Sequence, residues 1–192
     1  MSIRLIIMGP QGSGKGTQAA RLAEALGIPT ISTGDLFRAN ITQATELGAL
    51  VQSYTARGEL VPDEVTNAMV RARLDEADVA EGFILDGYPR NAAQVVELDG
   101  MLEADGVHLD GALELVVDRE ALLARIARRA ELEGREDDTP EAIARRLDIY
   151  AEQTAPLTHA YADRGLLVRV DGEGEIEEIT ARLLAAVDGL AR

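Results

Sequence analysis

The chain of 192 residues contains no cysteine and no tryptophan, and only 3% of its residues are aromatic. Without cysteine, disulfides and cysteine-bound metals are excluded. The scarcity of aromatic side chains argues against the stacking platforms that bind single-stranded nucleic acid. No apolar run approaches the length that spans a membrane, and the sequence enters a strand-like run without a signal-peptide pattern. We therefore expect a cytoplasmic protein.

Positive charge is scarce as well. Lysine and arginine total 19 residues against 34 aspartate and glutamate residues, so the formal net charge at pH 7 is −15. This charge repels nucleic acid and anionic membranes, and we expect neither as a partner. A phosphate-rich ligand must then be held by local basic groups. With 46% apolar residues, the chain is expected to form one compact domain over residues 1–192.

Among the basic residues, Lys15 is the only lysine, and the other eighteen are arginines. A lysine ammonium is a compact charge on a flexible stem that can follow a moving phosphate, whereas a guanidinium binds acceptors in a rigid plane. Lys15 lies in residues 9–17, GPQGSGKGT, which have P-loop spacing and follow the apolar run Leu5–Met8. The glycines and a helix starting near Lys15 predict a phosphate site. The strand before and the helix after argue against an incidental glycine-rich turn.

Apolar strand-like runs alternate with long helical patterns. The runs cover residues 5–8, 83–86, 113–117 and 166–170, with a weaker one at 28–32. This alternation predicts an α/β fold of the P-loop, three-layer kind, in which a five-stranded parallel sheet carries helices on both faces. Ligands of such folds bind at the carboxyl ends of the strands.

Two segments interrupt the alternation. Residues 33–81 are too long for one crossover helix, and they indicate an inserted lobe of short helices starting near Asp35, near Glu46 and after Val61-Pro62. The second interruption, residues 131–138, is short and charged. Thr139-Pro140 after it supplies a helix N-cap and a first-turn proline, so a small flap is expected there.

Arginines cluster around the second interruption. Arg125, Arg128 and Arg129 share one predicted helix, Arg145 and Arg146 share the next, and Arg135 lies between the two helices. Like charges at this spacing repel one another, and either a bound phosphate or the neighbouring acidic residues of 131–138 would neutralise them.

Two further arginines favour the phosphate. Arg90 follows the strand 83–86 at its carboxyl end, and Arg38 lies in the first helix of the inserted lobe. A P-loop with arginines from separate elements is typical of phosphoryl transfer between two bound phosphates.

Metal chemistry has one candidate. Asp86 ends a strand beside the P-loop strand and could bind Mg²⁺ through water, although a turn cap is the alternative. Thr17 lies two positions after the P-loop lysine, where the common motif has its hydroxyl one position after, so direct ligation by Thr17 is doubtful. The sequence around His108 and His159 contains no pattern of residues that would accompany a catalytic histidine, so we interpret both as structural.

Four motifs together resemble the adenylate kinase family: GPQGSGKGT, ISTGDLFR at 31–38, GFILDGYPRN at 82–91 and ARRL at 144–147. The resemblance runs the whole length of the chain in the right order. It implies reversible transfer between ATP and AMP to give two ADP, with Mg²⁺, for adenine nucleotide homeostasis and salvage. It also implies a monomer with a nucleoside-monophosphate lobe at about 32–61 and a short lid at about 129–139.

The resemblance also implies roles for individual residues. For ATP, it implies Gly12, Ser13, Gly14, Lys15, Gly16, Thr17, Arg125, Arg129 and Gly174. For AMP, it implies Thr33, Gly34, Arg38, Glu59, Leu60, Val61, Gly87, Tyr88, Pro89, Arg90, Gln94, Arg135 and Arg146. The catalytic set would be Lys15, Arg90, Arg129, Arg135 and Arg146. No general base is needed, because the AMP phosphate is already an anionic nucleophile.

The sequence departs from the family pattern at two places. Only residues 130–134 separate Arg129 from Arg135, which resembles the short-lid form, so no zinc is expected. Gln11 stands where the family more often has proline, and its effect on the loop stays open.

Three alternatives stay open. A pyrimidine nucleoside-monophosphate kinase shares these motifs, but Thr33 and Gln94 favour AMP because a glutamine amide can meet both the donor and the acceptor of adenine. An ATP-binding switch without turnover would not need the full arginine set. GTP is possible as the donor, because backbone groups hold most of the donor base.

Overall fold

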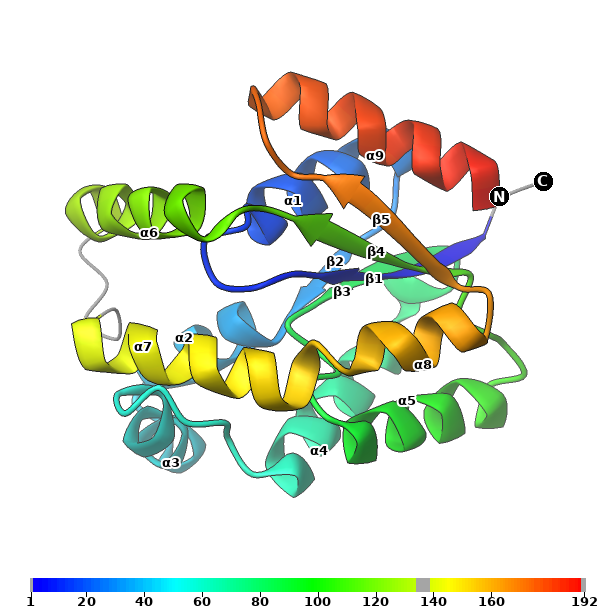
Figure 1. Cartoon of the computed structure of the whole chain (residues 1–192). Coiled ribbons are helices and arrows are strands. Elements are labelled where there is room, and N and C mark those ends of the chain that lie inside the picture. Colours follow the sequence, from blue (N-terminus) through cyan, green and yellow to red (C-terminus); the bar gives the residue numbers. More distant parts are fainter. Residues whose placement is uncertain (1, 134–138, 191–192) are drawn as a thin grey trace.

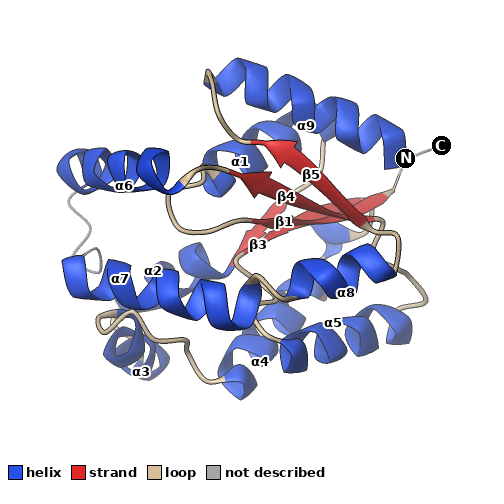
Figure 2. Ribbon diagram, viewed as in Figure 1, coloured by secondary structure: helices blue, strands red, loops and turns tan. Residues whose placement is uncertain are grey.

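The computed structural model describes residues 2–133 and 139–190, with the backbone only for 129–133. Its centre is a sheet of five parallel strands, drawn as red arrows in Figure 2. The strands are β1 (Ile3–Met8), β2 (Thr30–Ser32), β3 (Gly82–Asp86), β4 (Gly111–Val116) and β5 (Leu167–Asp171). Their order in the sheet is β2-β3-β1-β4-β5, so the strand before the P-loop is central. The predicted five-stranded parallel sheet is confirmed.

Helices cover both faces of this sheet (Figure 1), which confirms the three-layer α/β prediction. In chain order the helical segments are α1 (Lys15–Leu26), α2 (Thr33–Thr42), α3 (Glu46–Thr55), α4 (Asp63–Leu74), η1 (Ala77–Val79), α5 (Ala92–Ala104), α6 (Arg119–Glu133), α7 (Pro140–Ile149), η2 (Tyr150–Thr154), α8 (Leu157–Asp163) and α9 (Ile176–Leu190).

The predicted helix starts agree with these bounds. α1 begins at Lys15, α3 at Glu46 and α4 at Asp63, directly after Val61-Pro62. The Thr139 side chain accepts a hydrogen bond from the Ala142 amide and caps α7, which has Pro140 in its first turn. A side-chain acceptor at this position satisfies one of the amides that a helix leaves unpaired at its start.

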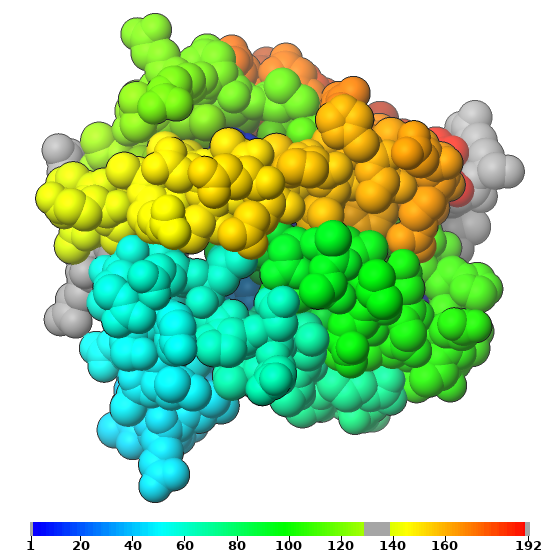
Figure 3. All heavy atoms as spheres, turned by 60° about the horizontal axis from the view of Figure 1, so that its bottom comes forward, coloured from blue at the N-terminus to red at the C-terminus, as the bar shows by residue number. Residues whose placement is uncertain are grey.

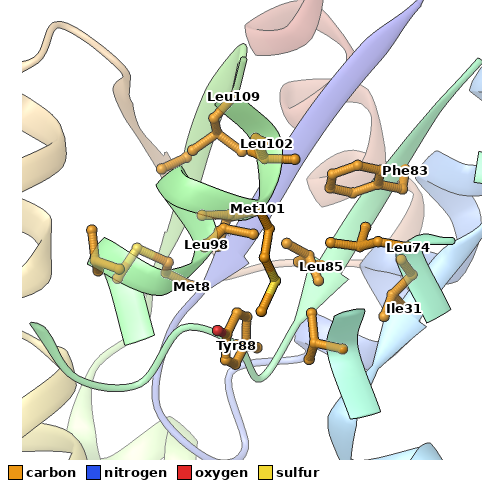
Figure 4. Close-up of a cluster of buried hydrophobic side chains, with 14 of the residues drawn as sticks. Met8, Ile31, Leu74, Phe83, Leu85, Tyr88, Leu98, Met101, Leu102 and Leu109 are labelled. Carbon is orange, nitrogen blue, oxygen red and sulfur yellow. The ribbon is translucent and has the colours of Figure 1, made fainter. Parts of the chain in front are cut away.

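Alternate residues of β1 divide the core into two layers. Leu5 and Ile7 point to one face, where they pack with residues of α1 and α9 such as Leu22 and Leu183. Ile6 and Met8 point to the other face, where the cluster in Figure 4 joins β3 to α4 and α5. Because strand side chains alternate between faces, a strand buried on both sides is apolar throughout, as Leu5–Met8 is.

The end of α3 and the turn after it, in the segment predicted to be an inserted lobe, contact both the first and the last turn of α7. In Figure 3 the cyan segment of α3 and its following turn lie against the yellow segment of α7. The Arg146 guanidinium donates to the Thr55 carbonyl at 3.1 Å, and a Cβ atom added at Gly58 would overlap the Ala142 carbonyl. The lobe and α7 therefore meet through backbone at close range, and the space between them and the sheet forms part of the site.

Candidate active site

A large cavity of about 1330 Å³ lies at the carboxyl ends of the strands. The P-loop and the loops after β2, β3 and β5 contribute to its walls. Residues of α2, α3, α6 and α7 also line it. Its position agrees with the general rule for open α/β sheets, in which ligands bind outside the strands' carboxyl ends.

The P-loop turns sharply between β1 and α1. Gly12 and Gly14 have φ of 86° and 90°, in the left-handed region that favours glycine. A Cβ atom at Gly12 would lie 2.7 Å from Ile126 Cγ1, so the loop also packs closely against α6. The Lys15 ammonium donates to the Pro10 carbonyl at 3.0 Å and lines the cavity. The loop thus presents backbone amides, a helix N-terminus and one ammonium to a shared space.

The loop after β3 holds Arg90 through its own backbone. Arg90 Nε donates to the Gly87 carbonyl at 2.7 Å, and the Thr33 hydroxyl donates to the same oxygen at 3.1 Å. The peptide bond between Tyr88 and Pro89 is cis. Burial lowers the pKa of the Arg90 guanidinium, and the Asp86 carboxylate partly offsets this shift. A bound anion would relieve the cost of burying this charge.

Other arginines converge on the cavity from separate elements. Arg125 of α6 donates to the carbonyl oxygens of Gly172 (2.9 Å) and Ser13 (3.4 Å), and so connects the P-loop to the loop after β5. Arg38 of α2 and Arg146 of α7 line the same cavity. Arg128 lines the cavity as well, and sequence analysis gave it no role of its own.

Gln94 is held between two partners. Its Oε1 accepts from the Arg90 backbone amide and its Nε2 donates to Asp63 Oδ1, both at 2.7 Å. Its side chain is 2% exposed and lines the cavity. The position predicted to read the acceptor base is therefore a fixed amide rather than a mobile side chain.

Asp86 is the metal candidate that the geometry supports. Its Oδ2 lies 3.7 Å from where a Cβ atom of Gly16 would be, so the carboxylate faces the start of α1. Asp86 and Thr17 both line the cavity. Within residues 2–133 and 139–190, no cluster of three or more His, Asp or Glu side chains could hold a metal ion by itself. A cation here would need ligands from nucleotide phosphates and water, which is how Mg²⁺ is usually bound beside a P-loop.

The structure brings most of the predicted site residues together. All predicted site residues that the structure describes in full line the cavity. They are Gly12, Ser13, Gly14, Lys15, Gly16, Thr17, Thr33, Gly34, Arg38, Glu59, Leu60, Val61, Asp86, Gly87, Tyr88, Pro89, Arg90, Gln94, Arg125, Arg146 and Gly174. Arg135 lies outside the described residues, and so does most of the predicted lid at about 129–139. The backbone of Arg129 belongs to α6, and its side chain is not described.

Sequence reasoning missed three polar residues that support the site. Beside Gln94, the Asn91 side-chain amide donates a hydrogen bond to the Asp63 carboxylate. The hydroxyl of the buried Thr154 donates to the Arg90 carbonyl. Asn91 has a local signal, since an asparagine before a helical pattern is typical of an N-cap. The other two have no such signal for this role. His108 and His159 are exposed and do not line the cavity.

None of the helices in the described ranges has the length and apolar character needed to cross a membrane.

Comparison with known proteins gives a consistent result. The family model for adenylate kinase matches residues 7–166. The chain is 58% identical to an adenylate kinase of Kocuria rhizophila over 185 residues, which cover 96% of this chain and 98% of that protein. It is 56% identical to an adenylate kinase of Nocardioides sp. over 97% of each chain. It is 54% identical to one of Thermobifida fusca, over 98% of this chain and all of the relative.

Proposed function

Because the chain belongs to the adenylate kinase family, it is a nucleoside-monophosphate phosphotransferase, and we propose ATP as its donor, AMP as its acceptor and Mg²⁺ as its metal. The observation that carries this proposal is one cavity whose lining includes both the P-loop and Gln94. Lys15 of the P-loop and arginines from four different elements line the same cavity, so two phosphate groups could be held in it together.

The donor half would be formed by the P-loop and α6. Residues 12–17 would bind the ATP phosphates through backbone amides, and Arg125 would hold the loop that carries Gly174 against the donor nucleotide. Arg129, one turn after Arg125 on α6, is proposed to reach the same phosphates.

The acceptor half would be formed by the inserted lobe, about 32–61, and the loop after β3. Thr33 and Gly34, Arg38, residues 59–61 and residues 87–90 would surround AMP, and Gln94 would meet its base. The short lid, about 129–139, would close over the phosphates from the other side, with Arg135 among its residues.

The reaction needs alignment more than proton transfer. An oxygen of the AMP phosphate attacks the γ-phosphorus of ATP, the bond from that phosphorus to the bridging β–γ oxygen breaks, and ADP leaves with the electron pair. Lys15 would move with the transferred group, while Arg90 and Arg146 neutralise charge beside it. Arg129 and Arg135 are proposed for the same charge neutralisation. The close approach of the lobe to α7 at Gly58 and Ala142 supports exclusion of water from this step.

Asp86 fits the role of holding Mg²⁺ through water, because its carboxylate faces the P-loop helix from the neighbouring strand. When bound, the ion neutralises charge on the β and γ phosphates. Asp86 also lies near Arg90, so the same carboxylate would balance the buried guanidinium.

A cytoplasmic enzyme without a nucleic-acid partner is proposed. The net charge of −15, which repels nucleic acid, supports the second part. A monomer is proposed, as the resemblance to the adenylate kinase family implies.

The direct test is ADP release with ATP and Mg²⁺ against AMP, UMP, CMP and GMP. AMP should give the highest kcat/KM. Faster turnover with UMP or CMP would show a pyrimidine-specific enzyme and overturn the acceptor assignment. ATP binding without turnover of any monophosphate would instead show a nucleotide-binding switch.

A further inference from the structure

The carboxylate of Asp63, the first residue of α4, accepts hydrogen bonds from two side-chain amides. Gln94 Nε2 donates to its Oδ1 at 2.7 Å, and Asn91 Nδ2 donates to Oδ1 at 3.0 Å and to Oδ2 at 3.1 Å. Among the described residues, Gln94 lines the cavity and Asp63 does not. Asp63 is therefore a carboxylate behind an amide that faces the ligand space.

These contacts fix which way round the Gln94 amide lies. A glutamine amide can turn over and exchange its oxygen with its nitrogen, and its partners decide the orientation. The Arg90 backbone amide, which can only donate, requires Oε1 on its side. The Asp63 carboxylate, which accepts, requires Nε2 on the other side. The two partners thus demand the same orientation.

Asn91 reinforces the arrangement. Its Oδ1 accepts from the Gln94 backbone amide at 2.9 Å, so its nitrogen must face Asp63. The carboxylate consequently receives two amide nitrogens whose orientations are each set by a backbone N–H group. A network in which every donor meets an acceptor is rigid, because turning any one amide creates a donor facing a donor.

The fixed orientation leaves a defined pattern for a ligand. An amide oxygen has two lone pairs and an amide nitrogen has two N–H groups, and the protein bonds above use one of each. The other lone pair and the other N–H offer an acceptor beside a donor. Adenine has the complementary edge, with a donating 6-amino group and an accepting N1. A 6-oxopurine has the opposite edge, with an accepting oxygen and a donating N1–H.

We propose that Asp63 is a positioning residue for base selection, which holds the Gln94 amide in the orientation that accepts a 6-aminopurine monophosphate and disfavours a 6-oxopurine monophosphate. This inference rests on the proposed function, because it takes the acceptor base to lie against Gln94. Asp63 itself touches no substrate and acts through the amide.

The isosteric change Asp63→Asn is the sharpest probe. An asparagine at position 63 presents one nitrogen, and whichever way it lies, that nitrogen faces the nitrogen of Asn91 or Gln94. Turning Gln94 to relieve the conflict would place its nitrogen against the Arg90 amide. The variant therefore keeps the shape of the site and removes the carboxylate that accepts from both amides, so that only the Arg90 backbone amide still sets the orientation of Gln94.

Glu64→Gln is the matched control. Glu64 is the next residue in the first turn of α4 and is exposed, so this variant makes the same charge change near the same helix end without touching either amide. Both variants are assayed for kcat and KM with AMP, with inosine monophosphate and with ATP, and their unfolding is measured.

For Asp63→Asn we expect a KM for AMP raised about tenfold and a ratio of kcat/KM for AMP over inosine monophosphate lowered about tenfold. The KM for ATP should stay within about twofold of wild type, as for a surface substitution. Glu64→Gln should match wild type throughout. In a Gln94→Ala background, Asp63→Asn should no longer change the ratio, because the amide through which it acts is gone.

The possible failures are distinct. A wild-type protein that does not turn over AMP refutes the proposed function, whatever the variants do. If wild type is active and Asp63→Asn equals Glu64→Gln, the inference is wrong. It is also wrong if Asp63→Asn raises the KM for AMP, inosine monophosphate and ATP alike. The same holds if its effect on the kcat/KM ratio of AMP to inosine monophosphate persists in the Gln94→Ala background. Each of those results would assign Asp63 a purely structural role.

Discussion

The Thr154 hydroxyl donates to the carbonyl oxygen of Arg90 at 2.7 Å, across 64 positions of the sequence. Thr154 is buried and ends the π-helical segment η2, which follows α7 directly. Wide helical turns of this kind are frequent at functional sites, where they redirect side chains. In this chain the turn fastens the backbone of the arginine loop to the segment that carries Arg146, so two arginines of the site share one support.

Replacing Thr154 by valine tests this support. Valine has nearly the same shape but leaves the partly buried Arg90 carbonyl without the hydroxyl, so the free energy of unfolding should fall by about 1 kcal/mol. The KM for AMP should rise as the Arg90 loop loosens. Denaturant unfolding and steady-state kinetics measure both effects. Thr154→Ser keeps the hydroxyl and should stay close to wild type, and equal losses in the two variants would show that only the methyl group matters.

Lys15→Arg should remove most activity while leaving the fold intact. The guanidinium is larger, planar and unable to follow a moving phosphoryl group, so kcat should fall about a hundredfold or more. The free energy of unfolding should change by less than about 0.5 kcal/mol, because the side chain lines an open cavity. The reverse exchange Arg21→Lys, in the same helix and away from the cavity, is the control and should have normal kinetics. Near-normal turnover of Lys15→Arg would contradict the role given to the ammonium.

Gly58→Ala should impair acceptor binding through a steric clash. Gly58 has φ of 69°, and a Cβ atom there would overlap the Ala142 carbonyl and push the lobe away from α7. Since a misplacement of about 1 Å can cost about a hundredfold in rate, kcat/KM for AMP should fall by about ten- to a hundredfold. The KM for ATP should change much less.

Gly27→Ala separates this clash from backbone strain. Gly27 has nearly the same φ, 68°, but a Cβ atom there would have nothing within 4 Å. Both variants should lose about 1 kcal/mol of stability from the left-handed conformation, while only Gly58→Ala loses activity toward AMP. Equal kinetics in the two variants would show that contact between the lobe and α7 does not matter for turnover.

Asp86→Asn should raise the Mg²⁺ concentration needed for half-maximal activity by about tenfold, because a neutral amide holds a hydrated cation less strongly. Titration of activity with Mg²⁺ at saturating nucleotide measures this value. Asp171→Asn is a matched control, since Asp171 ends β5 as Asp86 ends β3 but lies outside the cavity lining. An unchanged Mg²⁺ requirement in Asp86→Asn would leave Asp86 only its electrostatic role beside Arg90.

The limits of the strands show what sequence patterns can and cannot predict. The run 113–117 identified β4, but the strand begins two residues earlier, at Gly111. Gly111 and Ala112 do not have the apolar bulk of a strand pattern. Gly111 lies against the Leu190 side chain of α9, a contact with a residue far along the chain that a local pattern does not contain. A local pattern therefore located the strand and missed its start.

The same distinction applies to the site. The P-loop could be predicted because its glycines, lysine and helix start are contiguous, and local geometry produces its function. In the sequence, Asp63 has the pattern of an ordinary acidic residue in the first turn of a helix. Gln94, which donates a hydrogen bond to it, is 31 positions away. Thr154 has no pattern around it at all. Supporting residues of this kind depend on tertiary contacts that no short window contains.

The solitary lysine also makes the enzyme unusual as a chemical target. Lys15 is the only side chain in the sequence with a primary amine, and it lines the cavity beside Pro10. A lysine-directed label would therefore report from the phosphate site, and nucleotide occupancy could be followed as protection of one position. By the same reasoning, any acylation of a lysine side chain in this protein removes the one ammonium at the donor phosphates, so no such modification can be silent.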